Sequence, residues 1–309
     1  MDNDTDDVYE TKRFYEIDFL KGIATIFMVI FHFFYLMYHM NIANYNVRNG
    51  ILYSLAKVAH VIFIFIVGVN LAISYKKFKR KNKELYKENK SEYHSLYAGR
   101  QLKRVFYLLI AGGVMSLLSY LSFGDLFVKF GIFHFIAISI LFSIPVVKSK
   151  FLPLAISIIS GLLYSITHSN RIKLYSSVAC KNAPLFCFIS GIYNVKFSSL
   201  DHFSIIPFYG LVTFGIFVGN MLYNSSNRKF LNNKKSREFD ENFENDNLAK
   251  NMSLLGKYSF EIYFVHFVVF YLMLLAYKKT AIKMTEYYNN QSRNITSEIQ
   301  KVQLNSFNN

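Results

Sequence analysis

The chain contains 309 residues, of which 52% are hydrophobic, 18% aromatic and only 18% charged. Soluble domains carry about 25% charged residues, so this composition excludes an ordinary water-soluble globule. The 14 glycines, 4 prolines and 2 cysteines also exclude a collagen-like chain, a proline-rich linker and a disulfide-stapled secreted miniprotein. The class that remains is a membrane protein.

Apolar residues gather in seven blocks close to the length of about 20 residues that a helix needs to cross a bilayer. In chain order, these candidate spans are Phe19–Met37, Val58–Ile73, Val105–Leu121, Phe130–Val147, Phe151–Thr167, Ser204–Tyr223 and Phe260–Tyr277. An eighth block, Leu185–Val195, is shorter and follows Pro184, so we expect a re-entrant or interfacial segment there. The sequence therefore predicts an all-α, polytopic bundle of about seven transmembrane helices.

The charge pattern predicts the orientation of this bundle. A net charge of +15 would suggest a nucleic-acid partner in a soluble chain, but here eleven Lys or Arg gather in one connection, residues 75–104, against three Glu. Cytoplasmic loops of membrane proteins carry such an excess, and a loop resting on anionic lipid would lie on the same side. We therefore expect a lipid bilayer and no nucleic acid as partner, with the loop and the N-terminus cytoplasmic.

One membrane domain, residues 13–277, accounts for most of the chain. The tail 1–12 is acidic and lacks the pattern of a cleaved signal. We expect residues 224–250 to be a flexible polar connector on the cytoplasmic side, and residues 278–309 to be a polar C-terminal tail. Cys180 and Cys187 could form a disulfide on the opposite side, or Cys187 could be a small buried apolar residue that never pairs.

Ionisable side chains inside a span are costly and by default indicate function. At about 100° per residue, one face of the first span carries Asp18, Lys21, His32 and His39. His32 falls near the middle of the membrane, and histidine is well suited to proton transfer near neutral pH. We interpret His32 as a candidate general base, with a structural histidine as the alternative. Asp18 is either a further catalytic candidate or one half of a self-neutralising pair with Lys21.

Polar residues near other spans favour a polar interior cavity, although each alone is more typical of an interhelical hydrogen bond. They are Lys57, His60, His134, Asp201, His202 and His266. The eight histidines show no metal-ligand spacing on one helix, so we expect no metal site. No phosphate-binding glycine loop, zinc-protease motif or serine-hydrolase motif is present in the sequence.

Four stretches, in order, resemble the heparan-alpha-glucosaminide N-acetyltransferase catalytic-domain family. The first stretch, similar to the family's opening, consists of residues 15–24 (YEIDFLKGIA) followed by residues 27–32 (FMVIFH). Residues 130–137 (FGIFHFIA), 199–210 (SLDHFSIIPFYG) and 254–266 (LLGKYSFEIYFVH) are similar to its later landmarks. The same opening is shared, more distantly, by other membrane acyltransferases.

The resemblance implies an enzyme that uses cytosolic acetyl-CoA, or a related acyl-CoA, to acylate a sugar amine or hydroxyl, or a similar acceptor, reached from the opposite side. Such an enzyme needs a basic mouth for the phosphates of the donor, which Lys21, Arg100, Lys103 and Arg104 could supply. It also needs a base beside the acceptor. We assign that role to His32, oriented by Asp201 or His134.

The sequence also departs from the family's pattern. Lys21 stands where arginine is common, and His202 and Ser204 stand where tyrosine and proline are usual. The lysosomal branch carries a reactive histidine just beyond the first span, where residues 41–50 here contain none. His39 is the nearest candidate, so a two-step route through an acyl-histidine stays open. The alternatives to an acyltransferase are a catalytically inactive relative and a small-solute or proton transporter, and the sequence leaves open whether two copies form a homodimer.

Overall fold

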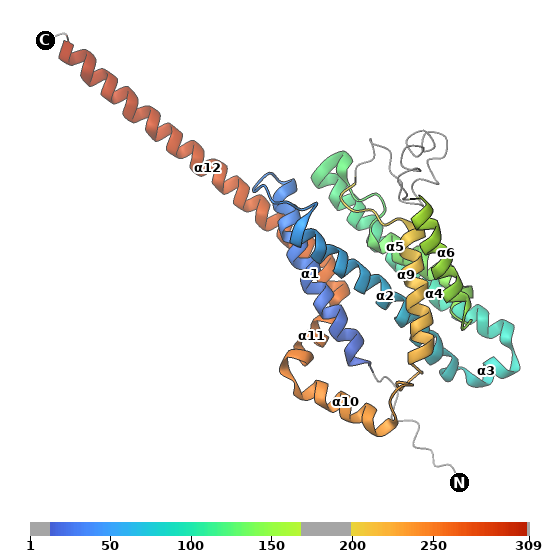
Figure 1. Cartoon of the computed structure of the whole chain (residues 1–309). Helices are drawn as coiled ribbons and strands as arrows, with labels where there is room; N and C mark the ends of the chain where they lie inside the picture. The colour runs from blue at the N-terminus through green and yellow to red at the C-terminus, as the bar shows by residue number, and fades with distance from the viewer. Residues whose placement is uncertain (1–12, 168–198, 308–309) are drawn as a thin grey trace, which may run out of the picture.

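The computed structural model describes residues 13–167 and 199–307, which form helices joined by short connections and contain no β-strand (Figure 1). Five helices are long and apolar enough to cross a membrane, and two shorter apolar helices accompany them. The long helices are α1 (Tyr15–His39), α2 (Gly50–Lys81), α4 (Lys90–Phe123), α9 (Ile205–Leu222) and α12 (Ser259–Phe307); the shorter ones are α5 (Ile132–Val146) and α6 (Leu152–Thr167).

All seven predicted spans fall on these helices, which confirms the prediction of an all-α integral membrane protein. The block Leu185–Val195 and both cysteines lie outside the described residues. The described part of the tail 278–309 continues α12, which leaves the bundle as a long single helix (Figure 1).

Helix α2 lies at the centre of the bundle, because it packs against both α1 and α9. Helix α6 packs on α9, α4 packs on α5, and α12 packs on α1. The main apolar core lies between α2, α5 and α9 and includes Ile64, Phe135, Ile140, Val212 and Ile216. Apolar packing alone gives little net driving force between helices in lipid, so close fit and polar contacts decide which faces meet.

The predicted loop 75–104 is mostly helical, which corrects that part of the sequence prediction. Helix α2 continues to Lys81, the short α3 (Lys83–Glu88) follows, and α4 begins at Lys90. Five aromatic rings pack together and hold this turn: Tyr75, Phe78, Tyr86, Tyr93 and Tyr97. We call residues 75–104 the basic hairpin, and the end of the bundle that carries it the basic end.

The segment 224–250 is also more than a flexible connector, contrary to the expectation. It contains α10 (Asn233–Asn245) and the start of α11 (Asn247–Lys257), and α11 packs along α1. Arg228 is 2% exposed and donates two hydrogen bonds to Glu16, of 2.8 and 2.6 Å, and one of 2.7 Å to Asp240. A buried arginine needs such paired carboxylates, so this segment is docked on the start of α1.

Candidate active site

The side chain of His32 is held by a second histidine from the other end of the sequence. The Nδ1 of His32 lies 2.8 Å from the Nε2 of His266, on α12. The Nδ1 of His266 lies 2.7 Å from the backbone carbonyl of Ile262. A carbonyl oxygen only accepts, so with both rings neutral His266 donates from Nδ1 and accepts at Nε2. His32 must then donate from Nδ1, which leaves its Nε2 without a proton and able to act as a base.

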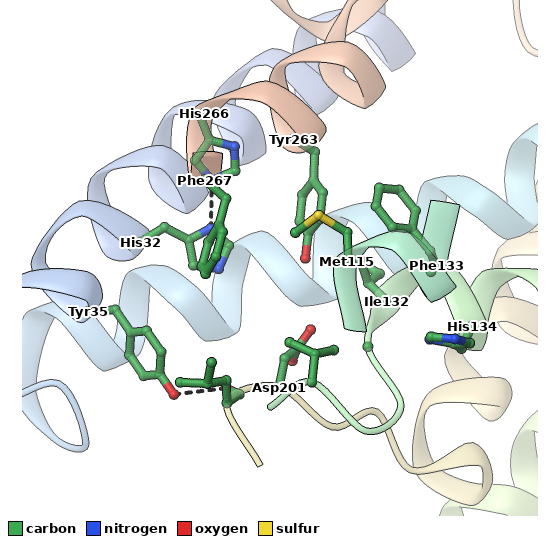
Figure 2. A pocket seen from close by; sticks show the side chains of 14 residues that line it. His32, Tyr35, Met115, Ile132, Phe133, His134, Asp201, Tyr263, His266 and Phe267 are labelled. Atoms are coloured by element: carbon green, nitrogen blue, oxygen red, sulfur yellow. Dashed lines mark hydrogen bonds between the residues drawn. The ribbon is translucent and has the colours of Figure 1, made fainter. Parts of the chain in front are cut away.

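That free nitrogen is turned toward a pocket. Figure 2 shows the ring of His32 with its second nitrogen facing the space between Tyr263 and Asp201. The pocket, which we call the central pocket, is small, with a cavity volume of about 40 Å³. Its walls come from α1, α4, α5, α12 and two loops, so its shape depends on helices that are distant in the sequence. A base that faces an enclosed pocket can take a proton from a molecule bound there.

Asp201 enters the central pocket from the loop before α9. The hydroxyl of Tyr35 donates a 2.8 Å hydrogen bond to the carbonyl of Leu200, which ties this loop to α1 (Figure 2). Burial raises the pKa of Asp201 to about 7, an effect partly offset because its carboxylate accepts hydrogen bonds from the N–H groups of Ile132 and His202. A carboxyl with such a pKa changes charge in the neutral range, which is typical of functional sites.

Tyr263 completes the wall opposite Asp201. Helix α12 presents Tyr263, His266 and Phe267 at spacings of three and four residues, so the three side chains share one helix face. The Tyr263 ring packs edge-on against His32, with ring centroids 5.9 Å apart, and its hydroxyl is directed toward Asp201 in Figure 2. One face of α12 therefore both orients His32 and closes the pocket.

His134 lines the central pocket but does not orient His32. Its ring stacks on Phe130, with centroids 5.7 Å apart, and lies against Gly112, where an added Cβ would meet the ring at 2.8 Å. Figure 2 shows its ring on the far side of the pocket from His32. Within the described part of the chain, the partner of His32 is His266, and the expectation that His134 or Asp201 plays this part is not met.

A second, more open hollow adjoins the central pocket at the end of the bundle away from the basic hairpin. This distal pocket has a cavity volume of about 580 Å³ and shares His32, Tyr35, Leu200 and Asp201 with the central pocket. His39 lines it, together with residues from the 40–49 loop and from the first turns of α2. The shared residues lie where the two pockets meet, so a molecule in the distal pocket could reach His32.

A third hollow lies at the basic end, between α1, α2 and α4. This basic pocket has a cavity volume of about 360 Å³. It is lined by one carboxylate and by five cations: Arg13, Lys21, Lys77, Arg100 and Arg104. Burial lowers the pKa of Lys77, and the like charges of Arg80 and Arg13 lower it further. Such crowding of positive charge favours an anionic ligand.

Asp18 is that carboxylate, and the structure therefore places it away from His32. Lys21 donates a 2.5 Å hydrogen bond to Asp18, and Arg13 lies 3.4 Å from its other oxygen. The alternative reading of Asp18 and Lys21 as an ion pair at the start of the helix fits this geometry. Lys103, in contrast to Arg100 and Arg104, does not line the basic pocket.

The family model described as "Heparan-alpha-glucosaminide N-acetyltransferase, catalytic" matches residues 13–268. The chain belongs to this family. It has no match among the curated proteins or the solved structures.

Membership of the heparan-alpha-glucosaminide N-acetyltransferase family confirms the resemblance inferred from the four motifs. It identifies the chain as a member of a family of acetyltransferases, and the apolar helices make it an integral membrane protein. The matched range ends at residue 268, so it includes both His32 and His266. Among residues 13–167 and 199–307, no cluster of three His, Cys, Asp or Glu side chains could hold a metal ion.

Proposed function

We propose that the chain transfers an acetyl or related acyl group from acyl-CoA to the amine of an amino sugar or a similar small acceptor, with His32 as general base. The observation that carries this proposal is the hydrogen-bonded series from His32 through His266 to the carbonyl of Ile262. It leaves a basic nitrogen facing the central pocket. A histidine that served only to join two helices would have no need of a pocket beside its second nitrogen.

In the proposed reaction, the acceptor nitrogen attacks the thioester carbonyl, so that a C–N bond forms and the C–S bond breaks. The Nε2 of His32 takes the proton from the attacking nitrogen, and the imidazolium then gives this proton to the departing thiolate of CoA, which restores the neutral base. The imidazolium formed on His32 is stabilised because His266 accepts its other N–H. His266 is thus a positioning residue. The carboxylate of Asp201 attracts the amine and the positive charge that develops on it.

The basic pocket is our proposed site for the phosphates of acyl-CoA, because guanidinium groups bind phosphate bidentately. Lys21, Thr25, Met28 and His32 follow one stripe of α1 at spacings of four, three and four residues. At 1.5 Å per residue, about 16 Å separates Lys21 from His32 along the axis. The acyl arm would therefore run along this stripe, past Met28, which is 3% exposed and whose flexible side chain can move aside.

The basic pocket and the distal pocket lie at opposite ends of the bundle, and this arrangement supports transfer across the membrane. With the basic hairpin in the cytoplasm, the N-terminus is cytoplasmic and the donor arrives from the cytosol. The acceptor then enters through the distal pocket on the other side. The family resemblance implies that the acyl-CoA is cytosolic, and this orientation agrees with that implication.

Charge reversal at two neighbouring residues of α4 tests the proposed donor site. We expect Arg104→Glu to weaken acyl-CoA binding by about tenfold or more, because it replaces a phosphate-binding cation in the pocket with an anion. Lys103→Glu makes the same kind of change outside the pocket and should leave affinity within about twofold. Calorimetric titration of the purified proteins with acyl-CoA measures both, and equal losses in the two variants would contradict this site.

The raised pKa of Asp201 predicts a pH dependence. Below a pH of about 7 the carboxyl is protonated and resembles asparagine; above it the negative charge is present. The ratio of kcat/KM between wild type and Asp201→Asn should therefore be near one at low pH, rise with pH, and level off above about 7. We expect a plateau of roughly a hundredfold, the size of effect typical when one group that stabilises developing charge is removed. A ratio that is constant with pH would contradict a titrating role for Asp201.

The two-step alternative uses His39 as an acyl carrier. His39 lines the distal pocket and not the central pocket. Its ring is tilted by 55° against that of Tyr35, with ring centroids 4.4 Å apart. Acid-quenched protein incubated with labelled acetyl-CoA and no acceptor distinguishes the routes. Direct transfer predicts no label on the protein, whereas label on His39 in the tryptic peptides would establish the acyl-histidine route.

A further inference from the structure

The central pocket has one side that it shares with the distal pocket and one side that it does not. The shared side carries His32 and Asp201, and in the proposed reaction the acceptor reaches it from the distal pocket. The unshared side, which we call the inner side, is built from α4, α5, α12 and the loop before α5, and includes Met115, Phe133 and Tyr263. With the acceptor on the shared side, the inner side is left for the acyl group of the donor.

The size of the central pocket limits the acyl group that can lie there. Its cavity volume of about 40 Å³ has room for about three water-sized groups. An acetyl group consists of a methyl carbon, a carbonyl carbon and an oxygen, so it fills this space. Propionyl adds one methylene to acetyl and butyryl adds two. A butyryl group therefore needs space that side chains of the pocket now occupy.

Met115 occupies the inner side with a long, unbranched side chain. It is 7% exposed, and Figure 2 shows its thioether directed toward Tyr263, between His32 and Phe133. Truncation of Met115 would leave its own volume open to a bound acyl group. A chain that extends from a carbonyl beside His32 into the inner side would enter that volume.

The wall beyond Met115 is held by aromatic packing. Phe133 is 4% exposed, and its ring packs against three rings of α12, with centroids 5.0 Å from Tyr263, 5.3 Å from Phe260 and 6.4 Å from Phe264. A longer acyl group would have to separate these rings, and overpacking of a filled core is costly. The space that such a group needs is thus the space that Met115 fills.

The backbone that carries Met115 is also fixed in place. The hydroxyl of Ser116 donates a 2.7 Å hydrogen bond to the carbonyl of Val128, and the N–H of Val128 donates a 3.0 Å hydrogen bond to the hydroxyl of Ser119. One turn before Met115, Gly112 lies directly against the ring of His134. Helix α4 therefore cannot withdraw from the pocket without breaking these contacts.

We propose that Met115 determines the length of acyl group that the pocket accepts, so that acetyl fits and butyryl does not. The inference rests on the proposed function and adds a residue that determines donor specificity. The carbonyl of the acyl group lies beside His32, and its alkyl end points toward Met115. In a hydrophobic pocket, one methylene changes kcat/KM by about 10- to 200-fold.

Acetyl-CoA, propionyl-CoA and butyryl-CoA form a graded series of donors that differ by one methylene at a time. With glucosamine as acceptor, we expect the wild-type kcat/KM to be about a hundredfold lower, or more, for butyryl-CoA than for acetyl-CoA. In Met115→Ala this ratio should fall to within about fivefold. Butyryl transfer should rise above the wild-type level while acetyl transfer declines, because the smaller group is held less closely. A gain in butyryl transfer cannot come from general damage to the fold.

Two control variants separate pocket size from other effects of the substitution. Met115→Leu nearly conserves the volume of the side chain and should keep the preference for acetyl within about threefold. Met273→Ala makes the larger change at a position of α12 that is 48% exposed and outside the three pockets, and it should keep the preference as well. Free CoA has no acyl group, so calorimetric titration with it reports on the folding of each variant.

The possible outcomes separate this inference from the proposed function. Equal kcat/KM for acetyl-CoA and butyryl-CoA in the wild type, or an undiminished preference in a Met115→Ala protein that binds CoA, would overturn the role of Met115. Should Met115→Ala not bind CoA, the smaller change Met115→Val is tested with propionyl-CoA, and unchanged discrimination would again overturn it. No transfer from any of the three donors by any of the proteins would overturn the proposed function, and this inference with it.

Discussion

Replacing His32 with glutamine is expected to lower the single-turnover rate of acyl transfer about a thousandfold. Glutamine keeps a polar side chain that can still hydrogen-bond to His266, but it has no basic nitrogen to take the proton from the acceptor. Removing a positioned general base typically costs 10²- to 10⁴-fold in rate. Acyl-CoA affinity should stay within about twofold, because the basic pocket is about 16 Å away along α1.

Release of free CoA under single-turnover conditions measures this rate directly. His94→Gln is the matched control, since His94 lies in the basic hairpin and lines none of the three pockets. The control should turn over at the wild-type rate. A rate for His32→Gln within a few-fold of wild type would show that the imidazole is structural, and His266 would then simply join α12 to α1.

The second large effect is expected on stability, at the crossing of α1 and α11. A Cβ added to Gly256 would lie 1.7 Å from the backbone oxygen of Asp18, and one added to Gly22 would lie 2.0 Å from the backbone oxygen of Met252. Backbone atoms cannot yield as a flexible side chain can, so the two helices must separate. We expect Gly256→Ala to reduce the free energy of unfolding by about 3 kcal/mol, at the upper end of overpacking costs.

Gly99→Ala, in α4, is the control for helix propensity, because a Cβ there meets nothing within 4 Å. Alanine is the better helix former by about 1 kcal/mol, so this variant should be as stable as wild type or slightly more stable. Thermal denaturation of the detergent-solubilised proteins compares them, and Gly256→Ala should melt several degrees below the control. Equal melting temperatures would contradict the tight α1–α11 crossing.

Local patterns explain which parts of the fold the sequence could predict. A membrane span leaves a signal in a window of about 20 residues, and all seven apolar blocks became helices. The basic hairpin was predicted as a loop because its charges look like those of any solvated connection. Its helical form depends on the packing of tyrosines such as Tyr75 and Tyr93, which the charge pattern does not reveal.

The sequence predicted only part of the candidate site, because local patterns do not show which distant residues meet. The helical stripe selected His32 as a candidate, but a stripe gives only the direction in which a side chain points from the helix axis. Asp18 on the same face lies about 21 Å away along the axis. His266 is 234 residues from His32, and a histidine in an apolar span gives no hint of its partner. Likewise, the pairing of Arg228 with Glu16 spans 212 residues, and the polar composition around Arg228 suggested flexibility instead.

The most direct test of the central claim is to follow the acyl group itself. Purified wild-type protein is incubated with glucosamine and with acetyl-CoA that is labelled in the acetyl group, and the sugar product is identified by mass spectrometry. We predict labelled N-acetylglucosamine from the wild type and none above background from His32→Gln. No labelled sugar from the wild type, or equal amounts from the two proteins, would contradict a histidine-dependent acyltransferase.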